Sequence, residues 1–223
     1  MGGTGAMAKG TGIGGTGIKL GVYINEMQLA GNVIASQGTV EAESKGSSRS
    51  LANGDPVCVG DTITTSQSAS AQIRMADGGL VAIRPQTQLK IEKFAYRGSS
   101  KDNSLLLLTR GACRIVTGNI GKQYPENDLL KTPAATIGVR EADHEVAVIS
   151  PGKGGSYPSG TYDKVNHGTT FLRTDKGKLA IRPDEAGFAA DTGEMPTLLR
   201  AIPDFYNAAG SMEHEFPGSE GKK

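Results

Sequence analysis

The sequence lacks several features by which catalysts and membrane proteins are commonly identified. It contains no tryptophan, aromatic residues make up 5% of it, and its two cysteines are Cys58 and Cys113. Its 24 basic and 23 acidic residues are interspersed and give a formal net charge of +1, so no basic stripe is available to a nucleic acid. No apolar run approaches the roughly 18 residues of a membrane-spanning helix, and no signal-peptide pattern follows Met1. We therefore expect a soluble chain with no membrane span and no nucleic-acid partner, although a signal peptide removed earlier would leave no trace.

Patterns that could carry catalysis or hold a cofactor are also scarce. Residues 10–15 match the spacing of a dinucleotide-binding loop, but neither a buried strand before them nor a helix after them is predicted. His144 lies between Asp143 and Glu145, and in a strand it points away from both, so the three side chains do not converge on a metal ion. Several aspartates flank glycine or threonine in turns, where aspartate accepts hydrogen bonds from its own backbone: Asp55, Asp61, Asp77 and Asp175. We expect no enzyme, no cofactor and no metal site.

What the sequence does contain is β-strand patterning. Between Gly54 and Ile149, turns with glycine or aspartate alternate with short runs in which apolar and polar residues alternate, which is typical of half-buried strands. Asp77-Gly78 and residues 175–177 predict hairpin turns. Breaks in the pattern predict separate short strands near 104–109 and 112–117, 135–139 and 143–149, and 161–166 and 169–174. The predicted fold class is all-β, with stacked short antiparallel strands forming a Greek-key-like barrel or sandwich or a solenoid-like stack, and a small helical or irregular C-terminal appendage.

The composition divides the chain into three parts. Residues 1–31 form a glycine-rich arm with an amphipathic strand, residues 32–190 the β domain, and residues 191–223 a tail in which Pro203 limits any helix to short pieces. Ordering the arm costs about 1–2 kcal/mol per residue in backbone entropy, so its strand needs a sheet edge to pair with. That edge belongs either to the same domain or to a neighbouring copy of the chain, and without such an edge we expect the arm to be disordered. The residues of the arm that we expect to make this interaction are the apolar Ile13, Ile18, Leu20, Val22 and Ile24.

Several segments, in their order along the chain, resemble those of a FecR-type domain. The resemblance extends over residues 33–190. The matching segments are Val33–Val40, Leu51–Asp55, Val59–Thr65, Ala71–Gly78, Leu89–Glu92, Leu107–Gly111, Lys131–Arg140 and the later Gly168, Gly177 and Ala186–Phe188. The sequence departs from the family at Glu141-Ala142, where the family usually has Gly-Thr.

This resemblance implies a β-rich extracytoplasmic domain without catalysis, which in the name-giving members relays a signal in iron-citrate uptake. The cytoplasmic regulator-binding region and membrane helix of those members have no counterpart in this sequence, so the signalling role is carried over only in part. The residues alone leave Cys58 and Cys113 open between a disulfide and two buried thiols, and the resemblance favours the disulfide. Arg140, at the end of a matching segment, is the charged residue that we single out for a specific contact. Packing of its aliphatic stem on the strand face is the alternative.

Two functions follow from these observations. The leading one is a non-catalytic extracytoplasmic assembly protein, periplasmic, on the cell surface or secreted. It would self-associate into an oligomer or filament by donating the N-terminal strand to the next copy, because head-to-tail donation does not close on itself. The alternative is a periplasmic sensory, signal-relay or ligand-binding module of the FecR type that contacts a receptor or a surface carbohydrate. The expected partners are copies of the chain itself or another envelope or surface protein.

Overall fold

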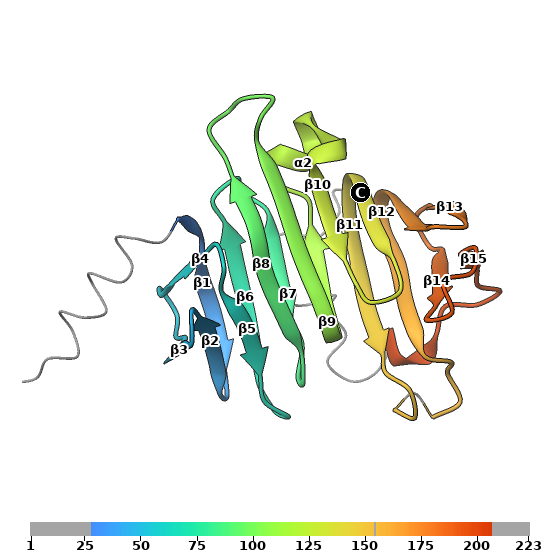
Figure 1. Ribbon diagram of the computed structural model, residues 1–223, viewed down its shortest axis with the longest axis horizontal. Coiled ribbons are helices and arrows are strands. Elements are labelled where there is room, and N and C mark those ends of the chain that lie inside the picture. The colour runs from blue at the N-terminus through green and yellow to red at the C-terminus, as the bar shows by residue number, and fades with distance from the viewer. Residues whose placement is uncertain (1–27, 154, 207–223) are drawn as a thin grey trace, which may run out of the picture.

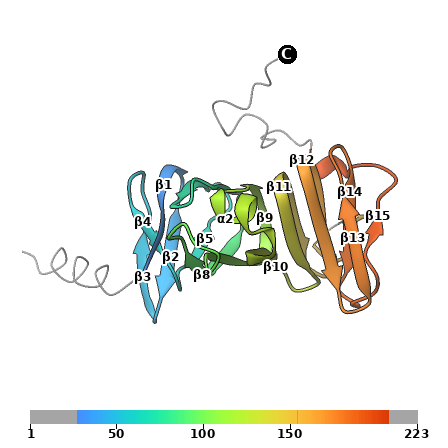
Figure 2. The ribbon, with the colours of Figure 1, turned by 90° about the horizontal axis from the view of Figure 1, so that it is seen from above.

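The computed structural model describes residues 28–153 and 155–206, and within them the protein is all-β, as the sequence predicts. The strands form one hydrogen-bonded network that is folded into two facing layers (Figure 1, Figure 2). In order of pairing, layer A consists of β3 (Ser47–Ser50), β2 (Val40–Ser44), β5 (Thr62–Thr65), β8 (Gln88–Ala95), the first half of β9 (Asn103–Val116), β10 (Asp128–Lys131), the first half of β11 (Thr136–Ile149), the second half of β12 (Gly160–Thr174) and β13 (Gly177–Ile181). Layer B consists of β4 (Pro56–Cys58), β1 (Leu29–Gln37), β6 (Ser70–Met75), β7 (Leu80–Ile83), the other halves of β9, β11 and β12, then β14 (Ala186–Ala190) and β15 (Thr197–Leu198).

Three long strands, β9, β11 and β12, therefore belong to both layers. Each contains a residue of positive φ between its two halves: Gly111 at 82°, Glu141 at 47° and Gly168 at 75°. This left-handed conformation turns the backbone, and glycine adopts it without strain. At Glu141, where the sequence departs from the FecR pattern, a glutamate occupies the conformation that glycine favours. The short strands predicted on either side of each bend are joined into one strand.

The space between the layers is filled by aliphatic side chains that alternate along the strands. Ile63, Leu89 and Leu108 of layer A pack in one cluster with Ile73 and Val146 of layer B, and each is at most 1% exposed. The fold is thus a sandwich whose layers share strands, which is one of the architectures that the alternation allowed.

A second apolar cluster lies on the outer face of layer B, where the C-terminal part of the described chain packs. It contains Ala147, Tyr162 and Tyr206, with Phe188, Phe205 and other residues against them. The predicted helical or irregular appendage consists there of the short strand β15 and the single 3-10 turn η2 (Asp204–Tyr206). The division of the chain at residues 31 and 190 stays a prediction; β1 begins at Leu29.

Two short helical segments, α2 (Asn119–Gln123) and η1 (Pro125–Asn127), connect β9 to β10 and allow the two strands to run parallel. Asp77 anchors this connection, because its Oδ2 accepts a hydrogen bond from the Ile120 N–H at 3.1 Å. None of the helices in the described part of the chain is both long and apolar enough to cross a membrane.

Candidate functional site

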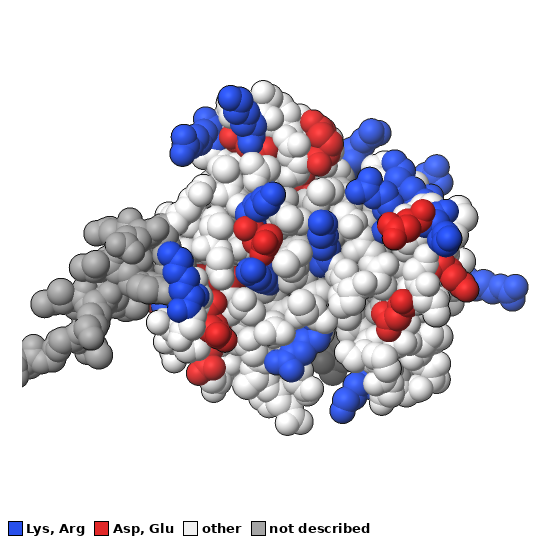
Figure 3. Space-filling model, in the orientation of Figure 1, with Lys and Arg blue, Asp and Glu red and all other residues white. Residues whose placement is uncertain are grey.

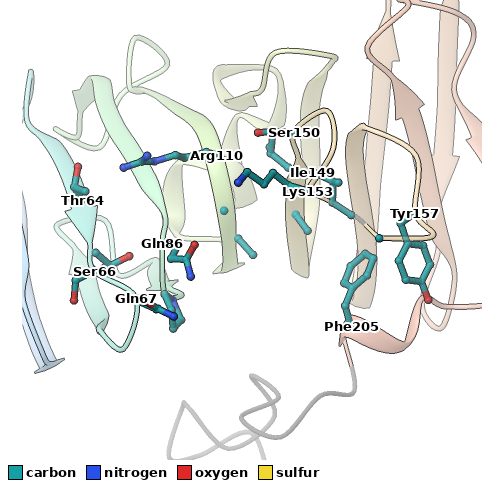
Figure 4. Close-up of a pocket in the computed structure, with 17 residues that line it drawn as sticks. Thr64, Ser66, Gln67, Gln86, Arg110, Ile149, Ser150, Lys153, Tyr157 and Phe205 are labelled. Atoms are coloured by element: carbon teal, nitrogen blue, oxygen red, sulfur yellow. The ribbon is translucent and has the colours of Figure 1, made fainter.

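An open groove of about 1120 Å³ lies where β9 passes from layer A to layer B, and we call it the end groove (Figure 4). One wall consists of the β5–β6 turn and the β7–β8 connection, and the other of the loop after β11 together with Phe205. Figure 4 shows Gln67 and Gln86 on the first side, Tyr157 and Phe205 on the second, and Lys153 between them. The groove therefore brings together segments that are far apart in the sequence.

The first wall is fixed by a network around two buried threonines. Thr87 donates its N–H to Thr65 Oγ1 at 3.0 Å, and Thr65 Oγ1 donates to the Arg84 carbonyl at 2.5 Å. Thr87 Oγ1 in turn accepts from the Ala112 N–H at 3.0 Å and lies 3.1 Å from the Ala112 carbonyl. These bonds tie the β7–β8 connection to β9 immediately after the bend at Gly111, so this wall is rigid.

The second wall is aromatic. The Tyr157 and Phe205 rings meet edge to face at 5.0 Å between centroids, and Tyr162 meets Phe205 at 5.4 Å. Tyr157 Oη donates to Asp204 Oδ1 at 2.6 Å, and this hydrogen bond raises the pKa of the Tyr157 phenol. The phenol therefore stays neutral at physiological pH and holds the turn η2 against the loop.

The charge of the end groove is positive. Arg110 and Lys153 line it, and none of its described lining residues is acidic. The remaining polar groups are mainly amides and hydroxyls, among them Gln67, Gln86 and Ser66, which donate and accept hydrogen bonds without charge. A ligand that presents carboxylates or other anionic groups beside an apolar or aromatic group would match this lining.

The groups best suited to acid–base or nucleophilic chemistry lie in the interior, away from the end groove. His144 is fully buried between the layers, with Nδ1 2.8 Å from Asp163 Oδ1 and with Nε2 lacking a partner among the described residues. Burial lowers the pKa of His144, but the carboxylates of Asp163, Asp143 and Asp128 together raise it more, and the net shift is upward. Burial raises the pKa of the Cys113 thiol to about 12, which keeps it protonated and unreactive. Residues 28–153 and 155–206 contain no group of three His, Cys, Asp or Glu side chains that could hold a metal ion.

A partly buried carboxyl group on β10, Asp128, should also affect stability when it titrates. Burial raises the pKa of Asp128 to about 6, and the charge of Asp77 adds to the shift. Because the pKa of Asp128 is higher in the folded than in the unfolded protein, its protonated form stabilises the fold. This stabilisation is complete below about pH 4 and is lost as the pH rises through about 6.

We therefore expect Asp128→Asn to stabilise the protein, relative to the wild type, by about 2 kcal/mol more at about pH 7.5 than at about pH 4.5. The reason is that the amide cannot ionise in this partly buried position. Urea unfolding of both proteins at the two pH values measures this difference. Parallel pH profiles of the two proteins would contradict the assignment.

None of the interaction residues predicted from the sequence is among the described residues that line the end groove. Ile13, Ile18, Leu20, Val22 and Ile24 lie outside the described residues, so their role in strand donation stays a prediction. Arg140 is exposed on the outer face of layer A, in a different hollow from the end groove, with its guanidinium carbon 5.9 Å from the centroid of the Phe171 ring.

The disulfide that the resemblance favoured is not formed. Cys58 and Cys113 are both free and buried. They lie on β4 and β9, with β1, β6 and β7 between them in layer B. Four strand spacings of about 4.8 Å separate these positions by about 19 Å, whereas a disulfide needs Cα atoms about 4.4–6.8 Å apart.

Sequence reasoning did not identify the lining of the end groove. Arg110 lies within a segment that matched the FecR pattern, Leu107–Gly111, and this was the available signal. Lys153, Tyr157 and Phe205 had no such signal, because their proximity depends on how the loop after β11 and the C-terminal turn η2 pack.

The two layers and the open, cationic groove define an all-β domain with a candidate binding site. The model of the family described as FecR protein matches residues 61–154. The resemblance to a FecR-type domain that the sequence predicts is confirmed over this part of the chain. No curated protein matches the chain.

Two solved crystal structures of a candidate anti-sigma factor from Parabacteroides distasonis resemble the chain. The structure at 1.65 Å resolution has a TM-score of 0.49 and 14% identity, covering 66% of this chain and 63% of that one. The structure at 2.50 Å has a TM-score of 0.50 and 13% identity, covering 66% of this chain and 62% of that one. The chain thus spans less than two thirds of these proteins, and at such identities the similarity concerns the fold alone.

Proposed function

We propose that the chain is a non-catalytic extracytoplasmic module of the FecR type, which relays a signal by binding a protein partner in the end groove. The observation that carries this proposal is the overlap between the family match and the groove. Every lining residue from Thr64 to Lys153 falls within residues 61–154, and only Gly155, Tyr157 and Phe205 fall outside. The extracytoplasmic location and the relay role rest on the family.

The size and charge of the groove indicate the kind of partner. Its volume of about 1120 Å³ exceeds the range of about 300–1000 Å³ that is usual for small-molecule pockets, and it is open to solvent. A protein segment therefore fits it better than a metabolite does. Arg110 and Lys153 favour acidic side chains on that segment, and the wall of Tyr157 and Phe205 favours an apolar or aromatic side chain beside them.

The family match favours signal relay over the self-assembly predicted from the arm. The strand that was expected to be donated lies within residues 1–27, outside the described part of the chain. Filament formation therefore stays a prediction from the sequence, and the proposal does not depend on it.

The test is a complementation experiment in the source organism. We expect deletion of the gene to change the transcription of a defined set of genes, and the wild-type chain to restore it. The double variant Arg110→Ala/Lys153→Ala should fail to restore it, because the groove loses both cations. RNA sequencing of the parent strain, the deletion strain and the two complemented strains measures the outcome, with protein levels checked by immunoblot.

The matched control is Lys45→Ala/Lys101→Ala, which removes two exposed cations that do not line the end groove. This control should restore transcription as the wild type does. Full activity of the groove variant would refute binding in the end groove, and an unchanged transcript profile in the deletion strain would refute the relay role itself.

A further inference from the structure

The outer face of layer A presents two adjacent rows of side chains that cross its strands in register. The first, the apolar row, contains Lys93, Leu105, Leu129, Gly138, Phe171 and Ala180. The second, the cationic row, lies two residues away along each strand, or three on β8 because of a register shift there. It contains Lys90, Leu107, Lys131, Thr136, Arg173 and Lys178. Their neighbours along the strands, such as Leu106 and Leu172, point into the core. Both rows therefore face solvent on β8 to β13.

Most of the charge in the cationic row is not neutralised. Lys131, Arg173 and Lys178 are exposed and form no salt bridge within the described residues, whereas Lys90 lies 2.6 Å from Glu92. Lys178 Nζ lies 4.3 Å from the centroid of the Phe171 ring, which joins the two rows. Figure 3 shows this face, with basic side chains gathered near β12 and β13. The row offers an unpaired positive charge to a partner.

A hollow of about 340 Å³ interrupts the apolar row, because Gly138 has no side chain between Leu129 and Phe171. A Cβ atom built on Gly138 would meet only Leu129 Cδ2 within 4 Å, at 3.7 Å. The charged residues that line the hollow are three cations and one acid: Arg140, Arg173, Lys178 and Glu126. The hollow has room for one bulky apolar side chain from outside.

The spacing of the free cations distinguishes between partner conformations. Lys131 and Arg173 are two strands apart, about 9.6 Å, and Arg173 and Lys178 are one strand apart, about 4.8 Å. On an α-helix that rises about 1.5 Å per residue, these distances correspond to about two turns and about one turn, so the matching acidic residues share one helix face. On an extended chain, the first distance corresponds to about three residues, which places successive acidic residues on opposite faces.

We propose that the outer face of layer A binds an acidic amphipathic α-helix of a partner protein, laid across β8 to β13. Its acidic side chains contact Lys131, Arg173 and Lys178, and one bulky apolar side chain enters the hollow at Gly138. A helix of about 16 residues spans the roughly 24 Å from β8 to β13. An anionic membrane surface would match the charge, but it presents no single side chain to the hollow.

The probe is a synthetic helical peptide of about 16 residues. Three of its glutamates share one helix face, the first two about two turns apart and the last two about one turn apart. Leucines and one phenylalanine form the adjacent apolar stripe. We expect the full chain to bind it in fluorescence anisotropy at low salt, and added salt to weaken the binding. A scrambled peptide of the same composition, and one with lysine for each glutamate, should bind at least about tenfold more weakly.

Two variants locate the binding on this face. Lys131→Glu/Arg173→Glu should weaken peptide binding at least about tenfold, whereas Lys45→Glu/Lys101→Glu, with the same change of net charge elsewhere on the surface, should leave it unchanged. Gly138→Val keeps every charge and fills the hollow, and valine favours a strand, so this variant should melt no lower than the wild type. It should also bind the peptide at least about tenfold more weakly.

Several results would overturn the proposal. They are absence of binding to the acidic peptide at submillimolar concentration, equal binding of the scrambled peptide, and equal weakening in the Lys45→Glu/Lys101→Glu control. Binding to phosphatidylglycerol vesicles that is lost in Lys131→Glu/Arg173→Glu, with peptide binding unaffected, would assign the face to a membrane and overturn it too.

Discussion

Replacing Gly111 by alanine should destabilise the protein by about 2–5 kcal/mol, because the change combines backbone strain with overpacking. The backbone of Gly111 has a φ of +82°, which an L-residue adopts at a cost of about 1–2 kcal/mol. The new Cβ would lie 2.5 Å from Thr87 Cα and 2.8 Å from Thr87 Cβ. Thr87 cannot easily retreat, because its side chain and N–H are hydrogen-bonded to Ala112 and Thr65.

Urea unfolding of the wild type and the variant measures this loss. Gly54→Ala is the matched control, because Gly54 also has a positive φ, +92°, but a Cβ there meets nothing within 4 Å. The control should lose only about 1–2 kcal/mol. Equal losses at the two positions would mean that the contact between β9 and Thr87 does not hold the bend.

The second large effect is expected for Asp61→Ala, which should destabilise the protein by about 2–4 kcal/mol. Asp61 is fully buried and accepts hydrogen bonds from Arg49 at 2.9 Å and 2.5 Å and from the Cys58 N–H at 2.7 Å. The hydrogen bond to Asp61 also raises the pKa of Arg49. Alanine would leave the Cys58 N–H without this acceptor, and the guanidinium of Arg49, whose side chain is 15% exposed, without its counter-ion.

Asp55→Ala is the comparison for this variant. Asp55 also accepts a backbone hydrogen bond in a turn, from the Ala52 N–H at 2.8 Å, but that bond is exposed. The control should lose no more than about 1 kcal/mol in the same unfolding experiment. If Asp61→Ala lowers the free energy of unfolding no more than Asp55→Ala does, the buried ion pair adds little stability to that of the turn hydrogen bond.

For these two aspartates, the turn hydrogen bonds could be predicted from the sequence, but the ion pair of Asp61 could not. The turn chemistry was predictable from short-range patterns, and the aspartates at 55, 61 and 77 do accept backbone hydrogen bonds within two to three residues. The pairing of Asp61 with Arg49 was not, because it depends on how the β2–β3 hairpin packs near β4.

The strand pattern was predictable for the same local reason, but the continuity of the strands was not. Residues 104–109 and 112–117 were predicted as separate strands, although a single glycine within a strand pattern is also compatible with a bulge or bend in one continuous strand. In the structure, Gly111 bends β9 without ending it, since each half pairs with different strands of a different layer. No pattern within a short window distinguishes a bend from a break.

The candidate surfaces were the least predictable part. The end groove is lined by residues between positions 64 and 205, and the two rows on layer A depend on a parallel pairing of β9 with β10 across a helical connection. Such registers are set by contacts that are far apart in the sequence. Arg140 was singled out for a specific contact, and that role stays a prediction. Its neighbour Phe171, and Lys178 beside that ring, became visible only once β11 to β13 were paired.

The sharing of strands by both layers has a mechanical consequence. In a sandwich joined only by loops, one sheet can shear over the other by repacking the side chains between them. Here β9, β11 and β12 continue covalently from one layer into the other, so shear would have to stretch or unzip backbone. Tension applied at either edge is therefore transmitted through the peptide chain itself, and the domain should yield by peeling its outer strands, β3, β4, β13 and β15, before its centre separates.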